Sequence, residues 1–304
     1  MTGKYQQRFG FYGNEPPPGD PHGTAFGLPM GERTLGHMLR HQGYATGIVG
    51  KWHLGFTPDR FPLKRGFQEF FGFLDSEHPY FGPDLENPDN LIYRGYNRVT
   101  EPQYLTRAFV REAVSFIQRH ASHPFFLYAP FNATHLPLQA EPAMLARFAH
   151  IADTKRRYFS AMLTHLDETV GAIITAIRAV GLERDTLVVF VSDNGCITAK
   201  SSCRNAPLRG GKFNLWEGGI RVPFILSWPG TIGAARAYRQ PVSALDLVPT
   251  LLTAAKGAAY VDPSLDGVNL LPYLTGPAAS APHDYLFWGS KTNLIIRDIH
   301  PLFC

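Results

Sequence analysis

A lysine and a histidine follow a short apolar run near residue 50. The run from Tyr44 to Gly50 leads into Lys51 and His53, within the segment Gly-Lys-Trp-His-Leu-Gly. If the extended backbone continues, residues two apart point to the same side, and the flanking glycines allow sharp turns. The pair therefore suits an anion, although a surface turn explains the same residues when they are considered alone.

Two further strand-like runs end in polar side chains. His135 follows the apolar run Phe125 to Ala129 in a proline-bounded turn, where an imidazole suits acid catalysis or a structural hydrogen bond. Asp193 and Asn194 follow the β-branched run Thr186 to Val191. Their oxygens are ligands that hard cations such as calcium prefer, although Asp-Asn-Gly is also common in turns.

A glycine-rich segment carries the fourth group of charges. Between Pro207 and Pro223 it holds four glycines and the cations Arg209, Lys212 and Arg221. Such a backbone is able to approach an anionic ligand closely. A solvated loop is the alternative, but Trp216, Ile220 and Val222 indicate that part of the segment is packed.

The elements that must position these residues alternate between strands and helices. Helical spacing predicts helices at Thr34 to Gln42, Leu105 to Ile117, Tyr158 to Val180 and Ala244 to Ala255, and further short strands at Phe224 to Trp228, Tyr285 to Trp288 and Asn293 to Arg297. This alternation predicts an α/β fold with a mostly parallel central sheet flanked by helices on both faces. Ligands bind beyond the carboxyl ends of such strands, so we expect the four polar groups around one crevice.

Composition excludes several classes of protein. The 304 residues are 44% hydrophobic and include 29 Gly and 25 Pro, which is incompatible with a disordered tail, a long helical bundle or a coiled coil. The net charge of +4 comes with no basic stripe for nucleic acid. No apolar run approaches the roughly 18 residues of a membrane span. Cys196, Cys203 and Cys304 form no framework, and the first two could be a small-loop disulfide or free thiols.

Taken together, the four ordered motifs resemble the sulfatases of the alkaline-phosphatase superfamily, within the bacterial arylsulfatase or N-acetylgalactosamine-6-sulfatase-like type. The resemblance is carried by Gly-Lys-Trp-His-Leu-Gly, Ser-Asp-Asn-Gly, and Arg-Gly-Gly-Lys with Trp-Glu-Gly-Gly-Ile-Arg-Val-Pro, and it extends to about residue 297. It implies an alkaline-phosphatase-like sulfatase core. It also implies hydrolysis of a sulfated carbohydrate or aryl sulfate by a formylglycine nucleophile beside Ca²⁺.

The resemblance also assigns roles to individual residues. Asp193 and Asn194 would be metal ligands, and Lys51 and Lys212 would bind the sulfate oxygens. His53 would assist the formylglycine hydroxyl. His135 would contact the substrate and protonate the leaving oxygen. Such roles are chemically sensible, because cations neutralise charge that develops on sulfate and a leaving alkoxide needs a proton.

The sequence departs from the family pattern at the nucleophile. None of the three cysteines is followed by x-Pro-Ser-Arg, and the family's first strand, which ends in two metal-binding aspartates, is absent. Residues 1–271 are therefore expected to be an incomplete catalytic domain and residues 272–304 the start of a small C-terminal subdomain, with both ends truncated. We expect weak or no specific calcium binding, and no sulfatase turnover by this chain alone.

Two other functions fit the same residues. One is a phosphomonoesterase or phosphonate hydrolase of the same superfamily, and the other is a non-catalytic anion-binding remnant. The expected partner is a small-molecule or oligosaccharide sulfate ester, and we expect no nucleic-acid partner and no membrane span. Family members are usually periplasmic, secreted or lysosomal, but the sequence predicts neither the location nor the oligomeric state of this chain.

Overall fold

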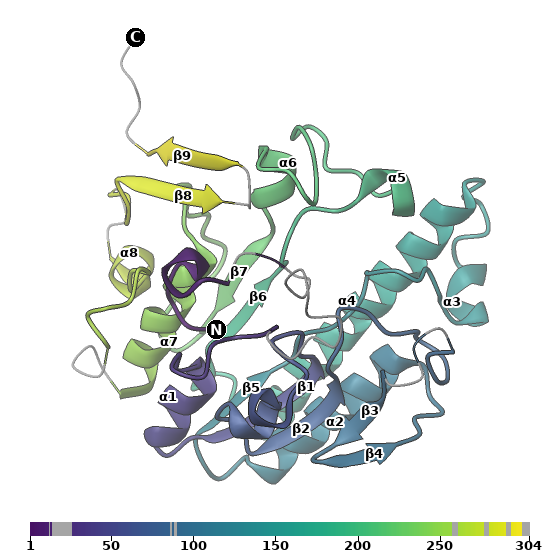
Figure 1. Ribbon diagram of the computed structural model, residues 1–304, viewed down its shortest axis with the longest axis horizontal. Helices are drawn as coiled ribbons and strands as arrows, with labels where there is room; N and C mark the ends of the chain where they lie inside the picture. Colours follow the sequence, from purple (N-terminus) through teal and green to yellow (C-terminus); the bar gives the residue numbers. More distant parts are fainter. Residues whose placement is uncertain are drawn as a thin grey trace.

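The computed structural model describes residues 1–11, 13, 26–85, 87, 90–256, 261–276, 280–289 and 293–299 (Figure 1); Cys304 lies outside them. The strands are β1 (Ala45–Lys51), β2 (Glu69–Phe73), β3 (Ile92–Arg94), β4 (Asn97–Val99), β5 (Phe125–Tyr128), β6 (Val188–Val191), β7 (Phe224–Ser227), β8 (Tyr285–Gly289) and β9 (Leu294–Asp298). The α-helices are α1 (Leu35–His41), α2 (Leu105–Arg119), α3 (Pro142–Ala146), α4 (Thr154–Ala179), α5 (Thr198–Ser201), α6 (Glu217–Ile220), α7 (Leu247–Lys256) and α8 (Leu271–Thr275). Short 3₁₀ turns are η1 (Gln6–Phe9), η2 (Pro58–Arg60), η3 (Pro62–Lys64) and η4 (Ala244–Asp246).

The central sheet is mixed, so the prediction of a mostly parallel sheet is wrong. Its five strands lie in the order β4-β3-β2-β1-β5. Strand β1 runs parallel to β2 and β5, whereas β2 with β3 and β3 with β4 are antiparallel. The reason is the short connection between β3 and β4, in which Arg94 pairs with Asn97 across a two-residue turn. Only antiparallel strands are joined by so short a loop. Strands β6 and β7 are also antiparallel.

Apolar residues cover both faces of this sheet. On one face, Val49 of β1 and Phe71 of β2 pack in one cluster with Phe109 of α2. On the other face, their neighbours Ile48 and Phe70 pack in a second cluster. This alternation follows from the period of two along a strand. Helix α4 packs on α2, and α1 contacts β1 and α7. No helix in the described ranges combines the length and hydropathy needed to cross a membrane.

Two glycines bring β1, β2 and the turn after β5 unusually close together just before Lys51. A Cβ atom on Gly72 would lie 1.8 Å from the Gly50 carbonyl oxygen, and one on Gly50 would lie 2.2 Å from the Pro130 carbonyl oxygen. Both residues have positive φ angles, which glycine adopts most readily. Next to them, the Lys51 backbone N–H donates to Pro130 O at 2.8 Å. The end of β1 is thereby fixed against the turn that carries His135.

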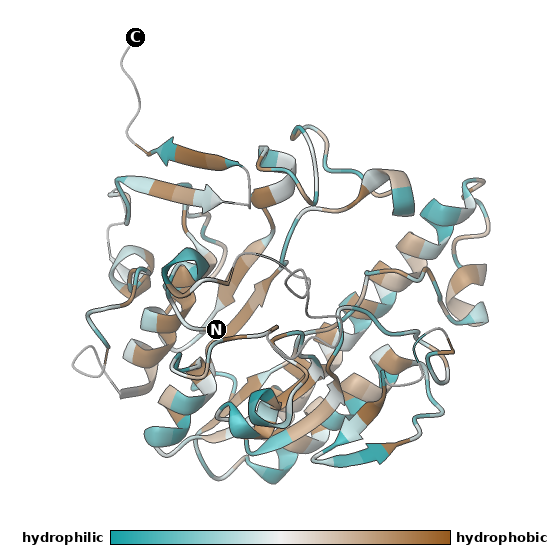
Figure 2. Cartoon of the chain, viewed as in Figure 1, coloured by the Kyte–Doolittle hydropathy of each residue, from teal (hydrophilic) through white to brown (hydrophobic). Residues whose placement is uncertain are grey.

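Strands β5 and β6 each pair on one side only within the described part of the chain. Strand β5 pairs with β1 and β6 pairs with β7, and no ladder joins β5 to β6. All eight of their residues are half-buried, although the sequences Phe-Phe-Leu-Tyr and Val-Val-Phe-Val are strongly apolar. Figure 2 shows β6 and β7 largely in brown, the colour of hydrophobic residues.

A buried carboxylate ties the α7 region to the segment before β8. The side chain of Asp246 is fully buried. It accepts hydrogen bonds from the backbone N–H groups of Ser243 at 2.7 Å and Val268 at 2.8 Å, and it lies 2.9 Å from His283 Nε2. Burying a carboxylate without partners is very unfavourable, so these three contacts are what allow Asp246 to lie there.

Candidate anion-binding site

Three predicted site residues meet where β1, the turn after β5 and the glycine-rich segment come together. Lys212 Nζ lies 3.2 Å from His135 Nε2. The charge of Lys212 also acts on the ammonium group of Lys51, and both lysines act on the His135 imidazole. Lys51, His135 and Lys212 are called the Lys-His cluster below. It brings together two ammonium groups and an imidazole, which suit a tetrahedral oxyanion.

His135 is held by contacts from a different part of the chain. The hydroxyl of Tyr80 lies 2.8 Å from the Asn132 carbonyl oxygen and 3.0 Å from that of His135. The ring Nδ1 lies 3.1 Å from Leu136 O and 3.3 Å from a Glu77 carboxylate oxygen. Because an ammonium group only donates, Nε2 must accept from Lys212, which places the proton of the neutral ring on Nδ1. Glu77 and Leu136 O then accept from that proton.

The electrostatic surroundings favour a neutral His135. Burial lowers its pKa, and the charges of Lys212 and Lys51 lower it further, against a hydrogen bond to Leu136 and the charge of Glu77. Burial likewise lowers the pKa of the Lys51 ammonium, while Asp193 opposes that shift. An entering anion would add negative charge next to both groups, and it would therefore raise both pKa values.

Asp193 and Asn194 lie at the end of β6, where the sequence predicted them. Asp193 is exposed, and its charge acts on Lys51 and Tyr128. Burial, together with this carboxylate, raises the pKa of Tyr128 to about 12. Within the described ranges, no three Asp, Glu, His or Cys side chains gather in a metal-binding group. Calcium takes six to eight oxygen ligands. Asp193 and Asn194 by themselves supply too few oxygen ligands to complete such a site.

His53 does not follow the strand geometry expected of it. Strand β1 ends at Lys51, and His53 has a φ of 49°, so the two-residue alternation with Lys51 does not extend to it. Its ring centroid lies 5.4 Å from that of Phe26 and 6.4 Å from that of Phe56. The role of His53 beside a formylglycine hydroxyl stays a prediction.

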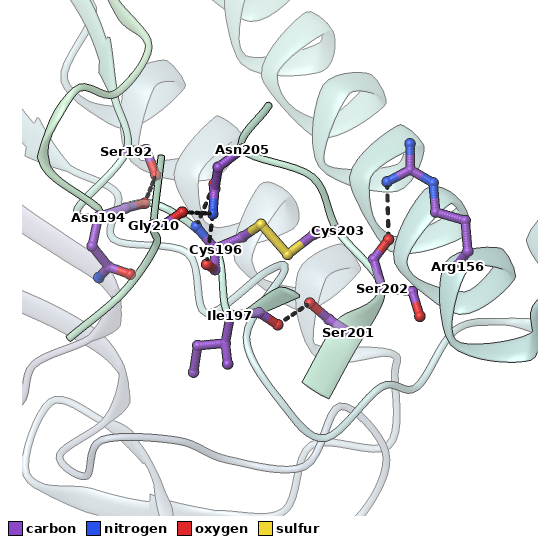
Figure 3. The surroundings of a disulfide bond; sticks show 10 residues. All are labelled: Arg156, Ser192, Asn194, Cys196, Ile197, Ser201, Ser202, Cys203, Asn205 and Gly210. Carbon is purple, nitrogen blue, oxygen red and sulfur yellow. Dashed lines mark hydrogen bonds between the residues drawn. A yellow bond between two sulfur atoms is a disulfide. The ribbon is translucent and has the colours of Figure 1, made fainter. Parts of the chain in front are cut away.

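A disulfide joins Cys196 and Cys203, which answers the question that the sequence left open. Figure 3 shows that Asn205 lies beside this bond. The Asn205 side chain accepts from the Cys196 N–H at 3.0 Å and donates to the carbonyl oxygens of Cys196 at 3.0 Å and Gly210 at 2.9 Å. The Lys212 N–H also donates to Cys196 O at 3.3 Å. The disulfide loop and Asn205 thus hold the backbone that carries Lys212.

Sequence reasoning missed Glu77, Tyr80 and Asn205. Glu77 and Tyr80 lie in an irregular segment between β2 and β3, where no periodic pattern indicates which side chains turn inward. Asn205 lies nine residues after Cys196 in the same loop. Its only signal was its place between the second cysteine and the glycine-rich segment.

The protonation of His135 predicts a pH-dependent affinity for sulfate, an anion with constant charge near neutrality. Because bound sulfate raises a pKa that starts below its usual value, affinity should be constant above the bound-state pKa. As pH falls from the bound-state pKa to the free-state pKa, the affinity should rise by about tenfold for each unit of difference between these two pKa values, and it should then level off. Isothermal titration calorimetry between pH 8 and 5 measures this profile.

His135→Gln should flatten the profile, whereas His123→Gln, at an exposed histidine, should leave it unchanged. Affinity that increases with pH, or an unchanged slope in His135→Gln, would contradict the assignment.

The family model described as Sulfatase matches residues 1–258 of this chain. Among curated proteins, the chain is similar to N-acetylgalactosamine-6-sulfatase of Sus scrofa, with 35% identity over 90% of this chain and 55% of that protein. It is also similar to arylsulfatase A of Bos taurus, with 34% identity over 95% of this chain and 60% of that protein. The chain thus spans little more than half the length of these relatives.

Solved structures give the same comparison in three dimensions. Ps i-CgsB in complex with k-i-k-neocarrahexaose superposes with a TM-score of 0.88 at 35% identity, covering 98% of this chain and 70% of that one. The phosphonate monoester hydrolase SpPMH of Silicibacter pomeroyi has a TM-score of 0.62 at 18% identity, over 94% of this chain and 68% of that one. At that identity the second likeness concerns the fold alone.

Proposed function

The chain belongs to the sulfatase family, and from that premise we propose that it forms the sulfate-binding part of a sulfuric ester hydrolase for a sulfated carbohydrate. The observation that carries the proposal is the 3.2 Å approach of Lys212 Nζ to His135 Nε2, within the electrostatic reach of Lys51. Two ammonium groups and one imidazole gathered in one place repel a further cation. They bind an anion instead.

Each residue of the Lys-His cluster then has a task. Lys51 and Lys212 donate to sulfate oxygens and neutralise the charge that moves onto the ester oxygen as the bond breaks. When His135 takes up a proton from solvent, Nε2 becomes a donor and would pass that proton to the leaving oxygen. Glu77, on the opposite ring nitrogen, would stabilise the imidazolium that carries the proton.

The nucleophile is the part that these 304 residues do not supply. The resemblance implies a formylglycine within Cys-x-Pro-Ser-Arg, and none of Cys196, Cys203 and Cys304 lies in that pattern. Cys196 and Cys203 are also bonded to each other. We therefore expect these residues by themselves to bind sulfate esters without hydrolysing them, and calcium to bind weakly.

A sulfated carbohydrate is the substrate class that the relatives favour. N-acetylgalactosamine-6-sulfatase and the neocarrahexaose complex of Ps i-CgsB both concern carbohydrates by name, and both share about a third of their residues with this chain. A phosphate or phosphonate ester would contact the same cations, and SpPMH, a phosphonate monoester hydrolase, has a similar fold. A phosphate ester is therefore one of the ligands to be tested.

Binding and turnover assays on the purified chain test the proposal. Near pH 5, where both esters carry about one negative charge, galactose 6-sulfate should bind, galactose should not, and galactose 6-phosphate should bind no more tightly than the sulfate. 4-Nitrophenyl sulfate should not be hydrolysed. Tighter binding of the phosphate would instead support the phosphoesterase alternative. Equal binding of galactose and its sulfate would overturn the proposed anion site, and sustained release of nitrophenol would show that the expected lack of turnover is wrong.

A further inference from the structure

We propose that Arg209, Phe213 and Trp216 form a second binding subsite, which takes a neighbouring sugar ring of an anionic oligosaccharide beside the Lys-His cluster. These three residues are called the aromatic platform. The inference rests on the proposed function, because it concerns the part of the substrate next to the reacting sulfate ester. It adds a subsite and the chemistry that this subsite recognises.

The two aromatic rings are exposed in a segment whose backbone is closely packed. Phe213 is 81% exposed and Trp216 is 49% exposed, whereas Gly218 and Gly219 in the same segment are buried. Phe213 also has a φ of 77°, an uncommon conformation for a bulky residue. Strained backbone that presents a large apolar ring to water does not stabilise the fold, and such conformations concentrate at functional sites.

Each ring of the aromatic platform is paired with a cation. The guanidinium carbon of Arg209 lies 3.9 Å from the centroid of Trp216, and Lys212 Nζ lies 5.5 Å from the centroid of Phe213. In the described ion pairs Arg209 has no carboxylate partner, whereas Arg221 and Arg297 both contact Glu217. The planar guanidinium of Arg209 is therefore available to a sulfate group.

This combination matches a sulfated sugar better than a neutral or purely apolar ligand. A pyranose ring presents C–H groups on its face, which pack on an aromatic ring, while its sulfate groups project towards the side. Phe213 follows Lys212 directly in the sequence, so the aromatic platform begins where the Lys-His cluster ends. A monosaccharide sulfate would occupy the cluster alone, and a longer chain would reach both.

The backbone of the aromatic platform is fixed before any ligand arrives. The carbonyl oxygen of Arg209 accepts from the Gly218 N–H at 2.7 Å, and that of Trp216 accepts from the Gly219 N–H at 2.7 Å. The Asn214 side chain accepts from the Gly211 N–H at 3.0 Å, and Asn205 donates to Gly210 O (Figure 3). A subsite held in this way loses little entropy on binding.

Calorimetric titration of the full chain with two probes tests the inference. The probes are inorganic sulfate, which is too small to contact the Lys-His cluster and the aromatic rings together, and a sulfated galactan hexasaccharide. Trp216→Ala and Phe213→Ala should each weaken binding of the hexasaccharide by about tenfold and change the affinity for inorganic sulfate by no more than about twofold. Arg209→Gln should weaken the hexasaccharide but not its desulfated form. Tyr96→Ala, at an exposed ring on the distant β3–β4 turn (Figure 1), is the control and should change neither probe.

The outcomes separate this inference from the proposed function. Unchanged hexasaccharide affinity in both aromatic variants would overturn the aromatic platform while leaving the Lys-His cluster intact. An equal loss for both probes would also overturn it, since the rings would then only support the loop. Failure of the unaltered chain to bind inorganic sulfate would instead overturn the proposed function. Circular dichroism of each variant checks that the fold is retained.

Discussion

Lys212→Ala will weaken the binding of inorganic sulfate by roughly ten- to hundredfold. A hydrogen bond from a charged donor contributes about 1.5–3 kcal/mol, which corresponds to this range of affinity. Lys212 reaches the centre of the Lys-His cluster through its 3.2 Å contact with His135, so its charge acts on the ligand and on the imidazole together. Lys51→Ala should have a comparable effect, because Lys51 is the other ammonium of the cluster.

A second readout distinguishes a local effect from a general loss of charge. Without the Lys212 ammonium, the pKa of His135 should rise, because one of the charges that lower it is gone. Nuclear magnetic resonance titration of the imidazole measures this shift. The matched control is Lys200→Ala, an exposed lysine on α5, which should alter neither the affinity nor the pKa. Similar losses in Lys200→Ala and Lys212→Ala would show that sulfate binds by overall charge alone.

Asp246→Ala will lower the free energy of unfolding by about 3–5 kcal/mol, the range observed when one partner of a buried pair is removed. The Asp246 carboxylate is fully buried and contacts three groups: the N–H of Ser243, the N–H of Val268 and the His283 ring. Its removal leaves two backbone donors and an imidazole without an acceptor. Each unsatisfied buried donor is itself unfavourable by about 1–3 kcal/mol.

Urea denaturation followed by circular dichroism measures this change. Asp262→Ala provides the control, because Asp262 also accepts a backbone hydrogen bond, from Ser264 at 2.8 Å, but on the surface. The free energy of unfolding of that variant should fall by about 1 kcal/mol or less. Equal losses at the two positions would mean that burial of Asp246 adds nothing to its contribution.

The helices and the apolar strands were predictable because each has a clear period and a terminal signal. The predicted helices at Leu105 to Ile117 and Tyr158 to Val180 correspond to α2 and α4, and the predicted strand at Phe125 to Ala129 corresponds to β5. The mixed sheet was not predictable in this way. Strands β3 and β4 have three residues each, too few to show a period, and β2 contains Gly72, which weakens a strand pattern.

The site was predictable where side chains follow a strand, and less so elsewhere. Lys51 ends β1, His135 follows β5 in the same sheet, and Asp193 follows β6 in a separate two-stranded sheet, so strand order accounts for Lys51 and His135 but not for the position of Asp193. His53 lies beyond the strand end, where a positive φ breaks the alternation. The partners of His135 were invisible, because Glu77 and Tyr80 approach from a loop whose path depends on tertiary packing.

The open sides of β5 and β6 have a consequence for handling the protein in solution. Each strand carries apolar side chains and has one backbone edge without a ladder partner among the described residues. The outer edge strand β4, by contrast, carries Asn97 and Arg98, polar and charged residues of the kind that discourage strand addition. Two molecules that meet at β5 or β6 gain hydrogen bonds and bury apolar surface. Self-association should therefore increase with protein concentration, and it competes with any ligand whose binding is measured in concentrated samples.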